Sequence, residues 1–158
     1  MRPRVALLLL ILALAGCAET DPEFEGIQSA RIAMNESIRN EQPGDYYIGR
    51  RYYKQDYKFW GYLRRPGQPW ATAKLVMMNE QQKLSPDRQM GHIGADNNYE
   101  YTVFGHYSGE TVYEPASNGF YPEFILTGYE LRTVAPPSIY RDPAAAGNPA
   151  RRVILPPY

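Results

Sequence analysis

The residues best suited to hold a ligand lie between positions 46 and 74, where basic and aromatic side chains are interleaved. This stretch has seven Lys or Arg residues and a single acid, Asp56. Guanidinium and ammonium groups pair with phosphate or carboxylate groups, and aromatic faces stack on bases or sugar rings. The pattern predicts a groove for an anionic polymer. Its candidate ligand-binding residues are Arg50, Arg51, Tyr57, Trp60, Tyr62, Arg64 and Arg65.

The same cations have a second interpretation, as partners of acids on neighbouring strands. Residues 89–131 contain no Lys or Arg. Opposite charges that face one another on adjacent strands stabilise a sheet, and we favour this structural interpretation. It predicts that replacing the arginines costs stability without any ligand present. The acids available for such pairs are Glu100, Glu114, Glu123 and Glu130.

The chain offers few residues for a catalytic or metal centre. Its two histidines, His92 and His106, do not form a zinc-ligand motif. The segment 105–109 has Tyr107 where a nucleophile elbow has serine. The segment 96–100 begins like a calcium loop, but Tyr101 stands where the EF-hand requires glycine, so an Asx-rich turn is predicted. No catalytic residue, metal or cofactor is predicted.

The N-terminus carries the most specific pattern in the sequence. Arg2 and Arg4 precede an apolar run, Val5 to Leu14, which is too short to span a bilayer comfortably. This is the layout of an export signal. The residues that follow, Leu14-Ala15-Gly16-Cys17, resemble the lipobox of bacterial lipoproteins. The resemblance implies that residues 1–16 are a signal peptide removed before Cys17, and that Cys17 carries a thioether-linked lipid and an acylated amine.

A lipid on Cys17 would fix the location of the protein. Cys17 is the only cysteine, so the exported part has no disulfide, and several acyl chains together give stable anchoring. Ala18 after the cysteine resembles the pattern of lipoproteins sorted to the outer membrane, which implies a domain facing the periplasm. Export and a formal net charge of zero argue against a nucleic-acid partner.

The exported chain divides into three parts. Residues 17–26 hold the lipidated cysteine and an acidic linker that contains Pro22 and Gly26. Residues 27–134 form the folded domain, which begins with a short helix. Residues 135–158 are rich in Pro and Ala, a composition that predicts an extended, mobile tail. Removing residues 136–158 is therefore expected to leave the domain nearly as stable. The helix is predicted from apolar residues at spacings of three and four: Ile27, Ala30, Met34 and Ile38.

Aromatic and β-branched runs separated by turn residues predict several short strands after Asp45. Pro66-Gly67 is a predicted hairpin turn, and the polar stretch 80–98 is a predicted long loop. The fold class is therefore mainly β, a small five- or six-stranded barrel preceded by one short helix. The predicted strands are Tyr46 to Tyr53, Tyr57 to Arg64, Ala71 to Asn79, Tyr99 to Tyr107 and Tyr121 to Arg132.

The segment Tyr101 to Leu131 looks like the last two strands of an oligonucleotide/oligosaccharide-binding (OB) barrel, in which a strand reaching a glycine is followed by an elaborated loop and a final apolar strand. The resemblance implies ligand binding on the second and third strands and their loops, but no particular activity. We therefore expect a non-enzymatic envelope lipoprotein that has a binding or structural role, with an envelope protein or an anionic glycan as partner. The alternative is an envelope hydrolase acting on glycan or peptide, which would need convergent carboxylates in a deep pocket.

Overall fold

The computed structural model describes residues 22–158, so the predicted signal peptide, the lipobox-like segment and Cys17 lie outside the described residues. Within this part of the chain, no helix is long and apolar enough to cross a membrane. The helices are α1 (Pro22–Arg39), α2 (Pro86–Gln89) and α3 (Pro143–Gly147), with a 3-10 turn at Trp70–Thr72. The strands are β1 (Tyr47–Arg51), β2 (Gly61–Arg64), β3 (Lys74–Asn79), β4 (Glu100–Glu114) and β5 (Gly119–Thr133).

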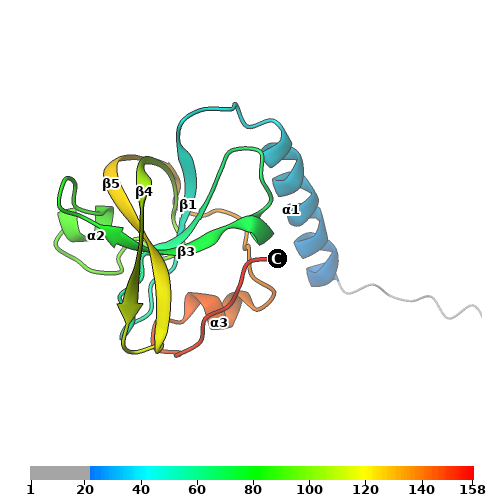
Figure 1. The fold of residues 1–158 in the computed structure, drawn as a ribbon. Coiled ribbons are helices and arrows are strands. Elements are labelled where there is room, and N and C mark those ends of the chain that lie inside the picture. Colours follow the sequence, from blue (N-terminus) through cyan, green and yellow to red (C-terminus); the bar gives the residue numbers. More distant parts are fainter. Residues whose placement is uncertain (1–21) are drawn as a thin grey trace, which may run out of the picture.

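The five strands close into a barrel in the order β1-β2-β3-β5-β4, with β4 pairing back onto β1 (Figure 1). All pairs are antiparallel except β3 and β5, which run parallel. The predicted fold class, mainly β with a small barrel after one N-terminal helix, is confirmed. Pro66-Gly67 lies between β2 and β3, where Gly67 has a φ of +73° that favours glycine.

The barrel interior is filled by aromatic and branched side chains. Gly105 interrupts the β4–β5 register there, and a side chain at this position would collide with the carbonyl oxygen of Ile125. Its φ of +146° also requires glycine, so this residue marks a bend that helps the long strand β4 curl around the barrel. The interior cluster consists of Tyr47, Trp60, Leu63, Val76, Tyr101, Val103, Phe124 and Leu126.

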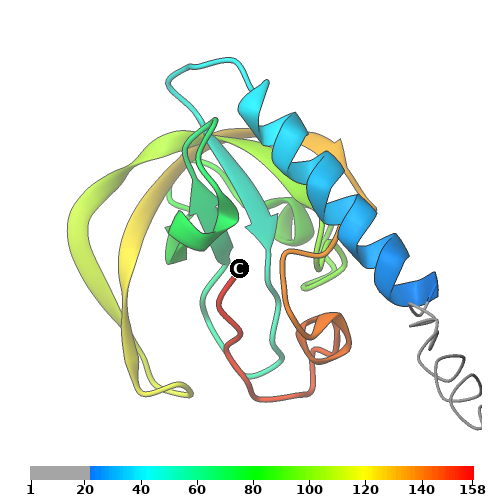
Figure 2. The same cartoon turned by 90° about the vertical axis from the view of Figure 1, so that its right-hand side faces the viewer.

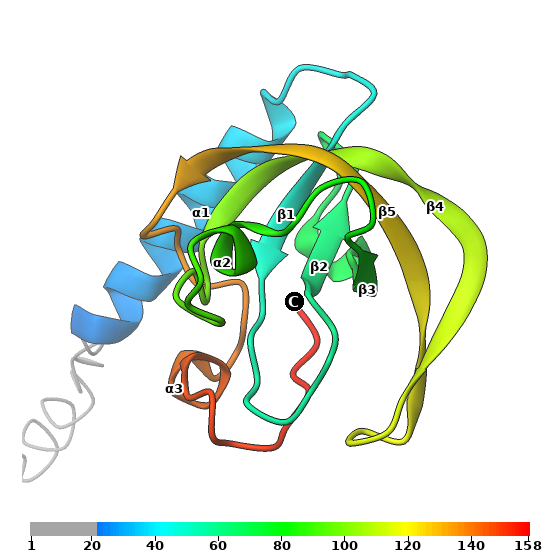
Figure 3. The ribbon, with the colours of Figure 1, turned by 90° about the vertical axis from the view of Figure 1, so that its left-hand side faces the viewer.

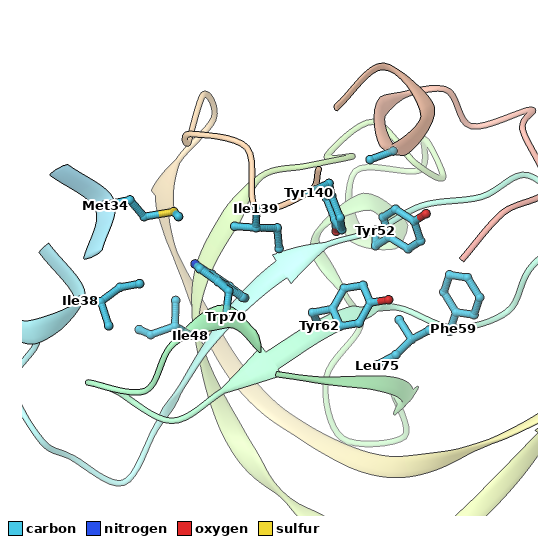
Figure 4. Packing of buried hydrophobic residues seen from close by; sticks show 11 residues of the cluster. Met34, Ile38, Ile48, Tyr52, Phe59, Tyr62, Trp70, Leu75, Ile139 and Tyr140 are labelled. Atoms are coloured by element: carbon cyan, nitrogen blue, oxygen red, sulfur yellow. The ribbon is translucent and has the colours of Figure 1, made fainter. Parts of the chain in front are cut away.

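A second hydrophobic core covers the outer face of β1, β2 and β3. The C-terminal half of α1 and the segment after Thr133 pack onto this face (Figures 2 and 4). Every residue of β1 and of β2 is buried as a result. The fully or nearly fully buried members include Met34, Ile38, Ile48, Tyr52, Phe59, Tyr62, Trp70, Ile139 and Tyr140.

Helix α1 is longer than the sequence predicts. Residues 22–26, expected to belong to the linker, form its first turns; proline is well tolerated at such a helix start. Only the C-terminal half of the apolar stripe is covered. Met34 and Ile38 are buried, whereas Ile27 is 40% exposed because the first half of α1 projects beyond the barrel (Figure 2).

The prediction of a mobile tail at residues 135–158 is wrong. Ile139 is fully buried and Tyr140 is 2% exposed on the outer face of the barrel. Backbone carbonyls of the segment accept hydrogen bonds from tyrosine hydroxyls of the barrel: the Tyr52 hydroxyl donates to Val153 and the Tyr62 hydroxyl to Leu155. A Pro-rich chain has few backbone N–H groups to donate, but its carbonyl oxygens can accept hydrogen bonds. Here the barrel supplies the donors, so the segment packs in an extended form.

The buried ammonium group of Lys54 fixes the same segment. It donates to the carbonyl oxygens of Ala145, Ala146 and Asn148 at 2.8, 3.1 and 2.7 Å. These carbonyls lie at the C-terminal end of α3, where a cation is favourable. The C-terminal segment is therefore part of the folded domain, and the domain boundary predicted at residue 134 does not exist in the structure.

Candidate functional site

The structure separates the seven predicted ligand-binding residues into three places. Arg50, Tyr62 and Arg64 lie on the outer face of the barrel, beneath α1 and the C-terminal segment. Arg51, Tyr57 and Trp60 line a cleft beside the loop 80–98. Arg65 stays at the surface. A single groove that contains all seven side chains does not form.

Arg64 and Arg50 belong to a chain of alternating charges. Arg64 makes two hydrogen bonds to Glu41, at 2.6 and 2.7 Å. Arg132 lies between Glu41 and Glu100, and Glu100 accepts a 2.7 Å bond from Arg50. The side chains of Arg50 and Arg64 are 0% and 1% exposed, so neither faces solvent. The expected pairing of these arginines with acids is confirmed for Arg50 and Glu100.

The other partners differ from those predicted. The carboxylate of Glu114 accepts hydrogen bonds from the backbone N–H groups of Ala116 and Ser117, and Glu123 accepts one from Asn79. Glu41 was missed because it lies just after α1, outside any strand. Its pKa is held below the ordinary value: burial alone would raise it, but the hydrogen bonds from Arg64 and Gly67 and the charges of Arg64 and Arg132 outweigh burial.

Arg51 lies at the end of β1 and binds two buried aspartates of the loop 80–98. Its guanidinium donates to Asp87 at 2.7 Å and to Asp96 at 3.1 Å, and it also donates to the carbonyl oxygen of Trp60. Both carboxylates are at most 1% exposed. The Tyr101 hydroxyl donates to Asp96 at 3.2 Å. One planar side chain thereby joins the barrel, the β1–β2 connection and the loop.

The two aspartates of this cluster have opposite pKa shifts. Burial raises the pKa of Asp96, and the charge of Arg51 only partly opposes the effect. Burial also acts to raise the pKa of Asp87, but Arg51 and hydrogen bonds from Gly94 and Ser85 hold it below its ordinary value. Asp87 is therefore an ionised acceptor whose oxygens already accept hydrogen bonds from protein donors.

The segment around Asp96 is a turn, as predicted.

Beside this cluster lies a cleft of about 660 Å³, here named the Arg51 cleft. Its walls come from the β1–β2 connection, from β3 and from the loop 80–98 with α2. In Figure 3, α2 and β3 lie on opposite sides of β1, and the loop runs from one to the other. Leu84 and Ile93 stand at its rim and are 50% and 59% exposed. The other lining residues include Arg51, Tyr53, Tyr57, Lys58, Phe59, Trp60, Met78, Glu80, Asp87 and Arg88.

The Arg51 cleft is mixed in character. Its aromatic and aliphatic walls can bury an apolar side chain or stack on a ring, and Lys58 is an exposed cation beside them. Arg88 pairs with Glu80 at 3.3 Å. Among residues 22–158, no three His, Cys, Asp or Glu side chains form a group able to hold a metal ion. The cleft can bind a partner through shape and apolar contact, with few free charges.

Sequence reasoning missed the loop residues that build this cleft. The stretch 80–98 was predicted as a long loop, and loops of that length in compact domains are often functional. The apolar residues Leu84, Met90 and Ile93 within an otherwise polar segment were the available signal, and the structure exposes all three.

Searches against protein-family models, curated proteins and solved structures give no significant match to this chain.

Proposed function

We propose that this chain is an envelope lipoprotein, anchored through Cys17 to the outer membrane and facing the periplasm, whose barrel domain binds another envelope protein without catalysing a reaction. The anchoring rests on the lipobox resemblance of residues 14–17 and on the export signal before it. A covalent lipid would be the only attached group. The described domain would then be held close to the membrane surface.

The Arg51 cleft is the observation that carries the binding role. Leu84 and Ile93 expose large aliphatic side chains at its rim, and exposed aliphatic residues next to aromatic walls are typical of protein-binding sites. Burial of Arg50 and Arg64 removes two of the cations on which recognition of an anionic glycan would depend. A protein segment with apolar side chains is therefore favoured over a glycan.

The fold resemblance supports the same location. In OB barrels the ligand surface includes the second and third strands and the connection between the first two. Here the outer face of β2 and β3 is covered by the chain's own C-terminal segment. Part of the β1–β2 connection stays accessible, at Tyr53, Tyr57 and Lys58, and forms one wall of the Arg51 cleft. The free part of that ligand surface and the cleft thus coincide.

The alternative, an envelope hydrolase acting on glycan or peptide, would need a carboxylate free to exchange a proton in the cleft. Asp87 borders the cleft, but Arg51, Ser85 and two backbone N–H groups already occupy its oxygens. This argues for a structural role of Asp87. A hydrolytic activity abolished by Asp87→Asn, in a variant that stays folded, would overturn the binding proposal.

Site-specific photo-crosslinking in intact cells tests the binding role. A photoreactive residue placed at Leu84 or Ile93 should give a discrete higher-mass adduct. Leu131 is a matched control, because it is also an aliphatic residue and is 55% exposed, but it lies on β5 outside the cleft. Equal adducts from Leu131, or none from Leu84 and Ile93, would contradict a partner in the Arg51 cleft.

A further inference from the structure

The β4–β5 hairpin extends beyond the barrel and ends in an exposed aromatic pair. Tyr113 and Phe120 lie opposite one another in the register, with ring centroids 5.2 Å apart. Tyr113 is 47% exposed and Phe120 is 71% exposed. All three ribbon views show this hairpin tip, residues 113–120, reaching the lower edge of the molecule (Figures 1, 2 and 3).

The hairpin tip is held in one conformation by its own hydrogen bonds. The carboxylate of Glu114 accepts from Ser117 N–H at 2.6 Å and from Ala116 N–H at 3.2 Å. The Tyr113 hydroxyl donates to the side-chain oxygen of Asn118 at 2.9 Å. An ordered tip loses little conformational entropy when it docks. The aromatic pair can therefore bind a surface at a small cost in conformational entropy.

The hairpin tip itself has almost no charged residues. Glu114 is the only charged residue between positions 111 and 122, and it is fully buried. Phe120 offers an apolar ring, and Tyr113 offers a ring with a polar end. This combination is enriched where a protein meets the boundary between lipid chains and water.

We infer that the hairpin tip inserts into the surface of the bilayer that holds Cys17; this inference rests on the proposed anchoring. Cys17 precedes Pro22, the first residue of α1, by five positions, so an extended chain places the start of α1 within about 18 Å of the lipid. Figures 1, 2 and 3 show the N-terminal end of α1 and the hairpin tip in the same, lower half of the molecule. The connection between α1 and β1 lies at the opposite end.

Anchoring makes even a weak contact effective. A tethered domain sees the membrane surface at an effective concentration in the millimolar range, so insertion of one aromatic pair suffices to orient it. The barrel then stands with the hairpin tip toward the lipid, on the same side as the start of α1 and as the segment that follows α3, which also reaches the lower edge in Figures 1 and 3. Residues 41–45 point away from the bilayer.

The test uses the mature lipidated protein reconstituted into phosphatidylethanolamine and phosphatidylglycerol vesicles. Lipidation blocks Cys17, so Ala116→Cys supplies one free thiol at the tip for an environment-sensitive dye and leaves Tyr113 and Phe120 intact. Gln42→Cys, at an exposed site in the opposite connection, is the matched control. Quenching by lipids with a nitroxide near the headgroup should be at least about two-fold stronger at position 116, consistent with burial into the headgroup boundary.

Adding Phe120→Ser to Ala116→Cys should reduce the quenching toward that of the control, while the melting temperature stays unchanged. If the vesicle-bound lipidated protein shows equal quenching at positions 116 and 42, the inference is wrong although the anchoring stands. If Cys17 carries no lipid and the protein does not bind vesicles, the proposed anchoring fails first. A dye shift that rises with protein density in lipid-free detergent would show a second copy of the chain on the tip, and would also overturn the inference.

Discussion

The guanidinium of Arg51 lies 2.7 Å from the carboxylate of Asp87, and this pair ties the end of β1 to a loop that begins almost thirty residues later in the chain. Asp96 binds the same guanidinium from the other end of the loop. The loop 80–98 is therefore held at two points by one side chain. The shape of the Arg51 cleft depends on that attachment, because the cleft has this loop as one wall.

Arg51→Met should lower the free energy of unfolding by about 3–5 kcal/mol, because it leaves two buried carboxylates without their cation. Chemical denaturation measures the loss. Arg51→Lys should restore only part of it, since an ammonium group cannot match the planar geometry that reaches Asp87, Asp96 and the Trp60 carbonyl together.

Arg65→Gln is the matched control for Arg51, because Arg65 pairs at the surface with Asp45, whose side chain is 98% exposed. Its cost should stay below about 1 kcal/mol. Combining Arg51→Met with Asp87→Asn and Asp96→Asn should recover part of the stability by removing the unpaired charges. A loss no larger for Arg51→Met than for Arg65→Gln would contradict the role given to the cluster.

Removal of residues 137–158 should lower the melting temperature by more than about 10 °C or prevent folding, because it uncovers the outer core. Tyr140→Ala alone should cost about 3–5 kcal/mol, as is usual for a large buried aromatic residue. Val134→Ala, at a site that is 54% exposed just before the segment, should have little effect. Thermal unfolding that is unchanged by the truncation would show that the segment does not pack in solution.

The strands were predictable and the C-terminal segment was not, for different physical reasons. Alternating aromatic and β-branched residues predict a half-buried strand directly, because the pattern lies within a few consecutive residues. Packing of Ile139 and Tyr140 depends on tyrosines of the barrel that are distant in sequence, so composition alone suggested a mobile tail. Strand alternation also fails just before β2, because Trp60 and Tyr62, two positions apart, lie in different cores.

The candidate site was predicted only in part, because its contacts also join residues that are distant in sequence. The basic residues of the stretch 46–74 were evident in the sequence, but their partners are distant: Glu100 lies 50 positions from Arg50, and the Asn148 carbonyl lies 94 positions from Lys54. No local pattern marks which arginine will be buried by α1 or by a later segment. The preference for ion pairs over a ligand groove followed from the acids elsewhere in the chain, and it was correct for Arg50 and Glu100.

Acidification should destabilise the domain through Glu41. Its folded-state pKa lies below the ordinary value of 4.5, so its contribution is fully present above that pH and is lost as the pH falls through the lower, folded-state pKa. Asp87 acts in the same direction, whereas the raised pKa of Asp96 acts against it. Unfolding free energies measured from about pH 7 to pH 3 should show the loss only in the acid range.

Glu41→Gln isolates this contribution. The variant should be less stable by about 2 kcal/mol at neutral pH, because Arg64 loses its charged, two-point acceptor. Its stability should then fall less steeply on acidification than that of the wild type. If the two proteins keep a constant difference down to about pH 3, protonation of Glu41 does not contribute to acid unfolding.

Cys17→Ser tests the anchor itself. No other residue of the chain has a thiol, so the proposed lipidation would depend wholly on this position. The variant should accumulate as an uncleaved precursor or appear in soluble fractions, and it should incorporate no labelled fatty acid. The described domain should be unaffected, because Cys17 lies outside residues 22–158, and the melting temperature of the purified variant should match that of the wild type. A Cys17→Ser protein that is processed normally and still fractionates with membranes through a salt and carbonate wash would refute lipid anchoring, and with it the orientation given to the hairpin tip.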